Sequence, residues 1–139
     1  MSQTHLLISD ADAQQLRMLL EGAAVHSERD RAQLDILEEE IERAKIVPRA
    51  LIPSDVVTMR SRVRIVDMRT GEQLVYQIVY PHEANYAAQK ISILAPIGMA
   101  LLGYSVGTEI EWRVPSGTRR LRIEAVQQQS DVSRSNAAA

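Results

Sequence analysis

Apolar residues in the first third of the chain recur at intervals of three and four, the spacing of a helix that buries one side. Two such series occur, separated by residues 24–27. The first consists of Ala13, Leu16, Leu20 and Ala23, and the second of Leu34, Leu37, Ile41 and Ala44. The pattern predicts two short helices with matching apolar seams, joined as an antiparallel hairpin.

Polar residues mark the expected helix ends. Ser9 is a predicted N-cap with Asp12 three positions later, and Ser27 caps a second helix whose first turn contains Glu28 and Asp30. Pro48 is expected to end that helix, which is then about 27 Å long. Helices this short are only marginally stable in isolation. The hairpin is therefore expected either to pack against the rest of the chain or to insert into a partner. Two core helices of a single domain remain the alternative.

The period changes to two from residue 55, which predicts strands. Val57, Met59, Val63 and Ile65 alternate with Thr58, Arg60, Arg62 and Arg64. A turn at residues 70–72 leads to a second strand over 74–80, and a short strand is expected over 90–94.

A two-turn helix is predicted from Pro96 to Leu102, with Gly103 as its left-handed cap. Strands over 109–114 and 120–123 flank a turn at 115–117 and form a hairpin. The expected organisation is a helical hairpin over 1–48, a globular α+β domain over 54–127 and a disordered tail over 128–139.

Charge divides between the two parts. Residues 1–50 carry 10 acids and 6 bases, net −4, whereas residues 51–139 carry 8 acids and 10 bases, net +2. Neither part has the strong basic excess typical of a nucleic-acid binder, so no sequence-specific DNA readout is expected. Cysteine is absent, which excludes disulfides and thiolate sites. With no leader-like start and no run of about 20 apolar residues, we expect a cytoplasmic protein without membrane contact.

A G-x-S-x-G pattern at residues 103–107 raises the possibility of a serine hydrolase. A nucleophile elbow requires serine between a strand and a following helix. Here the predicted helix precedes Ser105 and a strand follows it. We therefore interpret Ser105 as a linker residue and not as a nucleophile.

The segment 91–103, with the pattern S-x-x-x-P-x-G-x-A-L-L-G, precedes Val106-Gly107 and the strand of residues 109–113. Together they resemble the C-terminal domain of the GreA/GreB family, bacterial transcript-cleavage factors that bind RNA polymerase. Residues 55–63, 74–76 and 79–81 resemble the Rnk group within it. The likeness covers residues 50–127 strongly and the helical hairpin in layout only.

The resemblance implies an FKBP-like fold over residues 54–127, an antiparallel sheet curled around one short helix. It also implies docking on the rim of the polymerase secondary channel, with the hairpin pointing inward. We expect the strand-to-helix turn to present the docking residues outward. These are Leu94, Ala95, Pro96, Ile97 and Gly98.

Two departures from the family pattern bear on activity. The predicted hairpin is about half the length of a Gre hairpin, and Leu94-Ala95 stand where Gre chains commonly place an acidic or hydroxyl residue. Glu28 and Asp30 lie near the hairpin tip, where Gre factors hold catalytic magnesium, but acids are also favourable at a helix N-terminus. We interpret the chain as a non-enzymatic regulator that competes with Gre factors. The alternatives are residual cleavage stimulation through these acids and an interaction module with another partner.

Other groups of residues are weaker indicators of function. A basic face is predicted from Arg60, Arg62 and Arg64 on one strand and Arg120 and Arg122 on another, to meet acids or phosphates if the strands are neighbours. The favoured alternative is the solvated outer face of a one-sided antiparallel sheet, because such faces are normally charged. His82-Glu83 lacks the second histidine of a zinc motif, so no metal, cofactor or small-molecule substrate is expected.

Trp112 is predicted to be a core residue. An FKBP-like fold also suggests prolyl isomerase activity as a hypothesis. Such enzymes line an apolar pocket with aromatic residues, and the lack of phenylalanine disfavours it.

Overall fold

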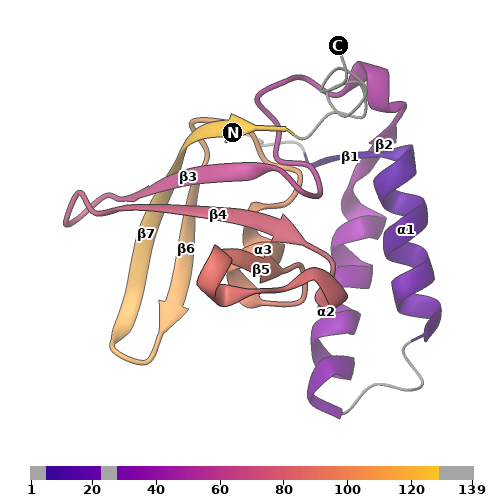
Figure 1. Ribbon diagram of the computed structural model, residues 1–139, viewed down its shortest axis with the longest axis horizontal. Coiled ribbons are helices and arrows are strands. Elements are labelled where there is room, and N and C mark those ends of the chain that lie inside the picture. Colours follow the sequence, from indigo (N-terminus) through magenta and orange to yellow (C-terminus); the bar gives the residue numbers. More distant parts are fainter. Residues whose placement is uncertain (1–5, 23–27, 129–139) are drawn as a thin grey trace.

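A computed structural model describes residues 6–22 and 28–128, except for the side chains of residues 28–30 and 112–114. Two helices, α1 (Asp10–Glu21) and α2 (Glu28–Arg43), run side by side in opposite directions next to a five-stranded sheet (Figure 1). The sheet has the order β5 (Lys90–Ser92), β4 (Gln73–Val79), β3 (Arg62–Asp67), β7 (Gly117–Gln127), β6 (Glu109–Val114). A short helix, α3 (Pro96–Leu101), precedes β6.

The two helices bury the predicted seams. Ser9 caps α1, because its Oγ accepts a hydrogen bond from the backbone N of Asp12 at 3.0 Å. Ala13, Leu16, Leu34, Leu37 and Ile41 are buried, and Leu20 and Ala44 are half-buried. The antiparallel helical pair is therefore confirmed. Ala23 and the cap expected at Ser27 lie outside the described residues.

The end of the second helix differs from the prediction. It stops at Arg43, five residues before Pro48, because the chain turns there into β2 (Lys45–Val47). This strand pairs in parallel with β1 (Leu7–Ser9). A backbone hydrogen bond of 3.0 Å from Leu7 N to Gly103 O joins β1 to the globular part. Three-residue strands are too short to show alternation, so the sequence pattern missed both.

The sheet is mixed, which corrects the expectation of a purely antiparallel one. Strands β3, β4, β6 and β7 pair antiparallel, but β5 pairs in parallel with β4. The first strand is also shorter than predicted. It begins at Arg62, because residues 58–61 form a turn in which Ser61 Oγ accepts a hydrogen bond from Thr58 N and Arg60 has a φ of 67°.

Several other expectations for the globular part are confirmed, although β5 ends at Ser92, two residues earlier than predicted. Gly71 and Gly103 have positive φ, the former in the β3–β4 turn and the latter just beyond α3. The strand of residues 109–114 is found as predicted, whereas β7 is longer than the four residues expected. Three-residue 3₁₀ helices, Pro81–Glu83 and Tyr86–Ala88, occupy the predicted loop, and another spans Arg49–Leu51.

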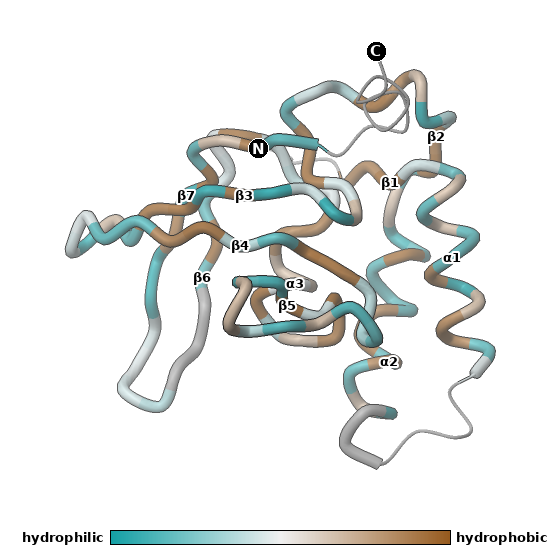
Figure 2. The backbone as a smooth tube through the Cα atoms, viewed as in Figure 1, coloured by the Kyte–Doolittle hydropathy of each residue, from teal (hydrophilic) through white to brown (hydrophobic). Residues whose placement is uncertain are grey.

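One hydrophobic core joins the helical pair to the sheet. It contains Leu16 of α1 and Leu37 of α2 together with Ile65 of β3, Ile78 of β4 and Ile123 of β7. In Figure 2 hydrophobic and hydrophilic segments alternate along both helices. The helical pair thus leans on the rest of the chain, as one of the sequence alternatives held.

Two further expectations concern parts outside the described residues, the burial of Trp112 and the tail beyond residue 128. Where the structure does describe the chain, no helix is long and apolar enough to cross a membrane.

Candidate functional site

The segment between β5 and α3 carries the predicted docking residues, but it does not present all of them outward. Ile97 and Gly98 are buried, Leu94 and Ala95 are half-buried, and Pro96 is exposed. Leu94 packs against the core. The expectation of an outward-facing apolar turn is therefore wrong for Ile97 and Gly98, because their helix positions face the sheet.

Gly98 has a packing role that the sequence signature did not reveal. A Cβ built on Gly98 would lie 2.5 Å from the carbonyl oxygen of Ser92 and 3.3 Å from the Cα of Ile93. Only a residue without a side chain lets α3 approach β5 this closely. The turn between them is held by Ser92, whose backbone O and Oγ accept hydrogen bonds from Ala95 N and Leu94 N, both at 2.9 Å.

The acidic tip residues remain a prediction. Glu28 opens α2 and Asp30 lies in its first turn, but their side chains are among those not described. With 16 residues, α2 is about 24 Å long, slightly shorter than expected. Among the described side chains, no three histidine, aspartate or glutamate residues converge as metal ligands do.

The predicted basic face is a mixed-charge surface. Arg62, Arg64, Arg120 and Arg122 alternate with buried neighbours on β3 and β7, which are adjacent strands. Arg120 lies 3.2 Å from Glu111 and 3.9 Å from Glu109, and Arg122 lies 3.2 Å from Glu124. Such pairs are typical of the solvated side of an antiparallel sheet.

Arg60 does not belong to this row. Its left-handed backbone turns the side chain toward Glu83, which accepts hydrogen bonds from Nη2 at 2.8 Å and Nε at 3.2 Å. The guanidinium also lies over the ring of Tyr80, 5.1 Å from its centroid. Burial acts to raise the pKa of Glu83, but the bonds from Arg60 and from Tyr80 N outweigh it and hold that pKa below its usual value.

A buried carboxylate joins α1 to the globular part. Asp12 Oδ2 accepts a hydrogen bond from the backbone N of Met59 at 3.1 Å, and only 8% of Asp12 is exposed. Burial raises the pKa of Asp12, although this hydrogen bond and the charge of Arg49 act to lower it. The sequence marks Asp12 only as part of a helix start, because no local pattern reveals a contact to residue 59.

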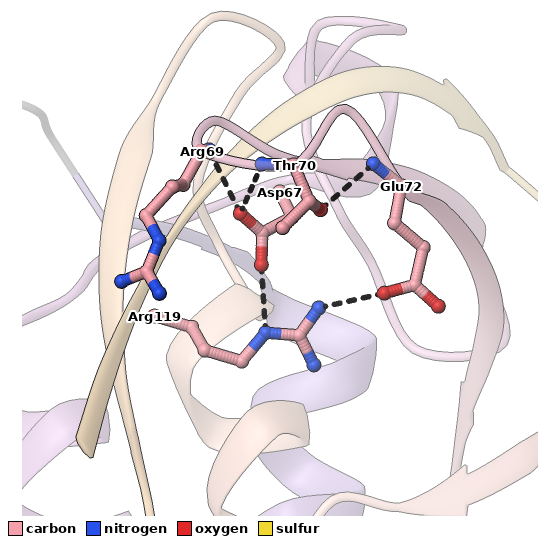
Figure 3. A network of polar contacts seen from close by, with 5 residues as sticks. All are labelled: Asp67, Arg69, Thr70, Glu72 and Arg119. Carbon is pink, nitrogen blue, oxygen red and sulfur yellow. Dashed lines mark hydrogen bonds and ion pairs between the residues drawn. The ribbon is translucent and has the colours of Figure 1, made fainter. Parts of the chain in front are cut away.

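A second buried carboxylate, Asp67, organises the far end of the sheet (Figure 3). Its Oδ1 accepts hydrogen bonds from Arg69 N at 2.8 Å and Thr70 N at 3.1 Å, and its Oδ2 lies 2.8 Å from Arg119 Nε. Arg119 also lies 3.1 Å from Glu72. The Arg119 guanidinium is the main cause that lowers the pKa of Asp67. The network joins the β3–β4 turn to β7, and the sequence pattern did not predict it.

Ser105 and His82 show no catalytic surroundings. The backbone of Ser105 forms an isolated antiparallel bridge with Val56, and Ser105 follows α3 and precedes β6, the reverse of a nucleophile elbow. The exposed His82 ring stacks on Tyr80, with the centroids 6.4 Å apart. Each residue therefore has a structural explanation.

Comparison with known families identifies the globular part. Residues 52–128 match "Transcription elongation factor, GreA/GreB, C-term", which covers β3 to β7 and α3. The chain belongs to the GreA/GreB family. Residues 4–47, with β1, α1, α2 and β2, match "Rnk N-terminus". The family resemblance drawn from residues 91–113 and the Rnk likeness are both confirmed.

Relatives within the GreA/GreB family agree over most of the chain. It is 38% identical over 117 residues to the "Regulator of nucleoside diphosphate kinase" of Escherichia coli K12, which covers 84% of each chain. It is 34% identical over 113 residues to "Transcription elongation factor GreA" of Rhodospirillum rubrum, covering 78% of this chain and 72% of the relative.

Solved structures show the same fold. A "prokaryotic transcription elongation factor GreA/GreB from Nitrosomonas europaea" is 40% identical, with a TM-score of 0.75, and the match covers 91% of this chain and all of the other. Gfh1 of Thermus aquaticus is 26% identical with a TM-score of 0.51, covering 91% of this chain and all of the other. The α+β, Gre-like FKBP-type fold predicted from sequence is thus confirmed.

Proposed function

We propose that this GreA/GreB family protein binds bacterial RNA polymerase at the rim of the secondary channel and regulates transcription without promoting transcript cleavage. It competes there with the longer Gre factors. The observation that carries the proposal is the combination of a Gre C-terminal domain over residues 52–128 with a helical pair whose second helix is only about 24 Å long.

The packing of the helical pair supports a blocking role. Leu16, Leu37 and Ile41 share one core with the sheet, and Asp12 is hydrogen-bonded to Met59. The pair is therefore held in a fixed direction relative to the domain that docks. A rigid projection of this length occupies the entrance of a channel but does not reach a deeply buried active centre.

The first experiment is a titration of the protein against core RNA polymerase with a Gre factor as competitor. We expect saturable binding that the Gre factor displaces. Absence of binding at micromolar concentrations, or binding that the competitor leaves unchanged, would contradict the proposal. In that case the family fold serves a different partner.

Pro96→Asp tests the docking surface. Pro96 is exposed at the first position of α3, where an aspartate is compatible with the helix N-terminus. We expect the variant to remain folded and to lose polymerase binding, because a charge replaces an apolar contact at the centre of the predicted docking segment. The matched control is Ser116→Asp in the exposed β6–β7 turn, which should bind like wild type.

Cleavage on stalled elongation complexes separates regulation from the Gre-like alternative. We expect no stimulation by the wild-type protein. Stimulation that disappears in the double variant Glu28→Ala/Asp30→Ala would instead assign the cleavage function to the first turn of α2.

A further inference from the structure

Strand β6 leaves one edge of the sheet open. It pairs with β7 on one side, and within the described residues no strand pairs with its other side. The opposite edge of the sheet, at β5, is partly paired. The chain folds back on this strand, and Asn85 exchanges two backbone hydrogen bonds with Lys90, both at 2.9 Å. An open strand edge is a template for another extended chain.

The backbone groups of Glu109 and Glu111 face this open edge. Ile123 N donates to Thr108 O at 3.0 Å, so residues 121 and 123 of β7 turn their backbone toward β6. Ile110 is paired with Leu121, and the intervening Glu109 and Glu111 therefore direct their N–H and C=O groups the other way. Two sets of hydrogen-bonding groups are available for an incoming strand.

Acidic residues of β6 lie opposite basic residues of β7. Arg122 of β7 lies opposite Glu109 of β6, and Arg120 lies opposite Glu111. Both glutamates are exposed, and each has a cross-strand neighbour on one side only. Opposite charges on adjacent strands stabilise pairing, so an added strand is favoured when it places cations beside these glutamates.

A groove of about 390 Å³ lies beside the same strand, bounded by β6, α2 and α3. Met99 of α3 and half-buried Ile110 and Tyr104 supply its apolar surface, and Glu40 of α2 lies on its rim. Ile110 alternates with Glu109 and Glu111 along β6. Alternate residues of an added strand would thus meet glutamates on one side and apolar side chains on the other.

We propose that the open edge of β6 and the adjacent groove bind an extended protein segment in which basic residues alternate with apolar ones. The segment adds as a sixth strand. Its basic side chains pair with Glu109 and Glu111, and its apolar side chains cover Ile110 and Met99. This mode is strand addition, in which backbone hydrogen bonds give affinity and side-chain alternation gives specificity.

Two arginines of the chain pair with the acidic residues of this surface. Arg43 is bound to Glu40 at 2.6 Å, and Arg120 reaches both Glu111 and Glu109 across the strand. The carboxylates at this edge and beside the groove thus already bind guanidinium groups of the chain itself, the same chemistry that the basic side chains of a partner would supply. A nucleic acid is a poor occupant, because its phosphates would meet these carboxylates.

The test uses a fluorescein-labelled octapeptide with arginine at alternate positions and valine or threonine between them. Anisotropy measures its binding to the full chain, and the emission of Trp112, the only tryptophan, reports changes at β6. We expect saturable binding, and Glu109→Gln/Glu111→Gln should weaken it about three- to tenfold through the loss of two cross-strand charge pairs. The matched control, Glu38→Gln/Glu39→Gln on the exposed side of α2, should change it less than about twofold.

Two N-methylated peptides separate strand addition from simple charge attraction. Methylation of every second amide blocks one edge of the peptide, so one of the two alternating sets should abolish binding while the other preserves it. No binding of the parent peptide would overturn the proposal. Equal binding by both methylated peptides, or by a version with glutamate in place of arginine, would overturn it as well. These outcomes are independent of RNA polymerase binding.

Discussion

Asp12 and Met59, 47 residues apart in the chain, are joined by a hydrogen bond of 3.1 Å from the Met59 backbone N to the Asp12 carboxylate. Both residues are buried. Asp12 belongs to the first turn of α1, and Met59 precedes the first strand of the large sheet. The hydrogen bond therefore fixes the start of α1 to the segment that precedes β3.

The buried charge of Asp12 lowers the stability of the folded protein, whereas its carboxylate oxygen stabilises the fold as the acceptor for Met59 N. Asp12→Asn keeps an acceptor for Met59 N and removes a buried charge, so we expect the free energy of unfolding at neutral pH to be unchanged or higher. Asp12→Ala leaves Met59 N without its partner and should lower that free energy by about 1–3 kcal/mol. Urea unfolding of the two variants and wild type measures both changes. Equal loss in the two variants would show that the carboxylate itself stabilises the fold.

The same residue predicts a pH dependence. The pKa of Asp12 is raised above 3.8 in the folded protein, mainly by burial. The folded state therefore binds a proton more tightly than the unfolded state, and this contribution to stability is lost as the pH rises through the folded pKa. Asp12→Asn should remove the contribution. The difference between wild type and this variant, measured by urea unfolding at several pH values, should favour wild type progressively more as the pH falls toward 4.

Gly98 should not tolerate even a methyl group. Because a Cβ would lie 2.5 Å from Ser92 O, Gly98→Ala must push α3 away from β5, and we expect a loss of about 1–3 kcal/mol. Gly22→Ala is the matched control, since a Cβ there has no neighbour within 4 Å. Thermal unfolding of both variants measures the contrast. A Gly98→Ala variant as stable as Gly22→Ala would show that the approach of α3 is not a fixed requirement.

Local signals account for what the sequence predicted well. The seams around Leu16 and Leu37, the cap at Ser9 and the Gly103 helix end depend on residues a few positions apart, and all are found. The GreA/GreB signature is also local, but the outward position expected for Ile97 and Gly98 is wrong, because a short helix must bury one side.

The features that sequence analysis missed depend on distant partners. The pairing of β1 with β2, the hydrogen bond from Met59 to Asp12 and the pairing of Arg119 with Asp67 join residues at least 38 positions apart. Arg60 follows the alternation of a strand yet adopts a left-handed turn, because residues 58–61 close on themselves through Ser61. No periodicity distinguishes such a turn from the strand it precedes.

Asp67 predicts a pH effect of the opposite sign. The Arg119 guanidinium holds its pKa below 3.8, so the folded state binds the proton less tightly than the unfolded state. This contribution is present above pH 3.8 and is lost as the pH falls through the lower, folded pKa. Asp67→Asn should therefore lose stability relative to wild type at pH 6 but much less at pH 2.5 in urea unfolding. Asp55→Asn, at an exposed aspartate, is the control. A deficit that stays constant with pH would assign the effect to packing.

Arg60 should reverse the usual order of alanine and glycine. Both substitutions remove the ion pair with Glu83, a partly exposed contact worth about 0–1 kcal/mol, and the contact with Tyr80. Alanine must still adopt the φ of 67°, whereas glycine does so without strain, so Arg60→Gly should be about 1 kcal/mol more stable than Arg60→Ala. At Gln15, exposed within α1, the same pair of substitutions should show the normal order, with glycine about 1 kcal/mol less stable than alanine. Urea unfolding of the four variants decides the matter, and the same order at both sites would mean that the turn at residues 58–61 relaxes when Arg60 is replaced.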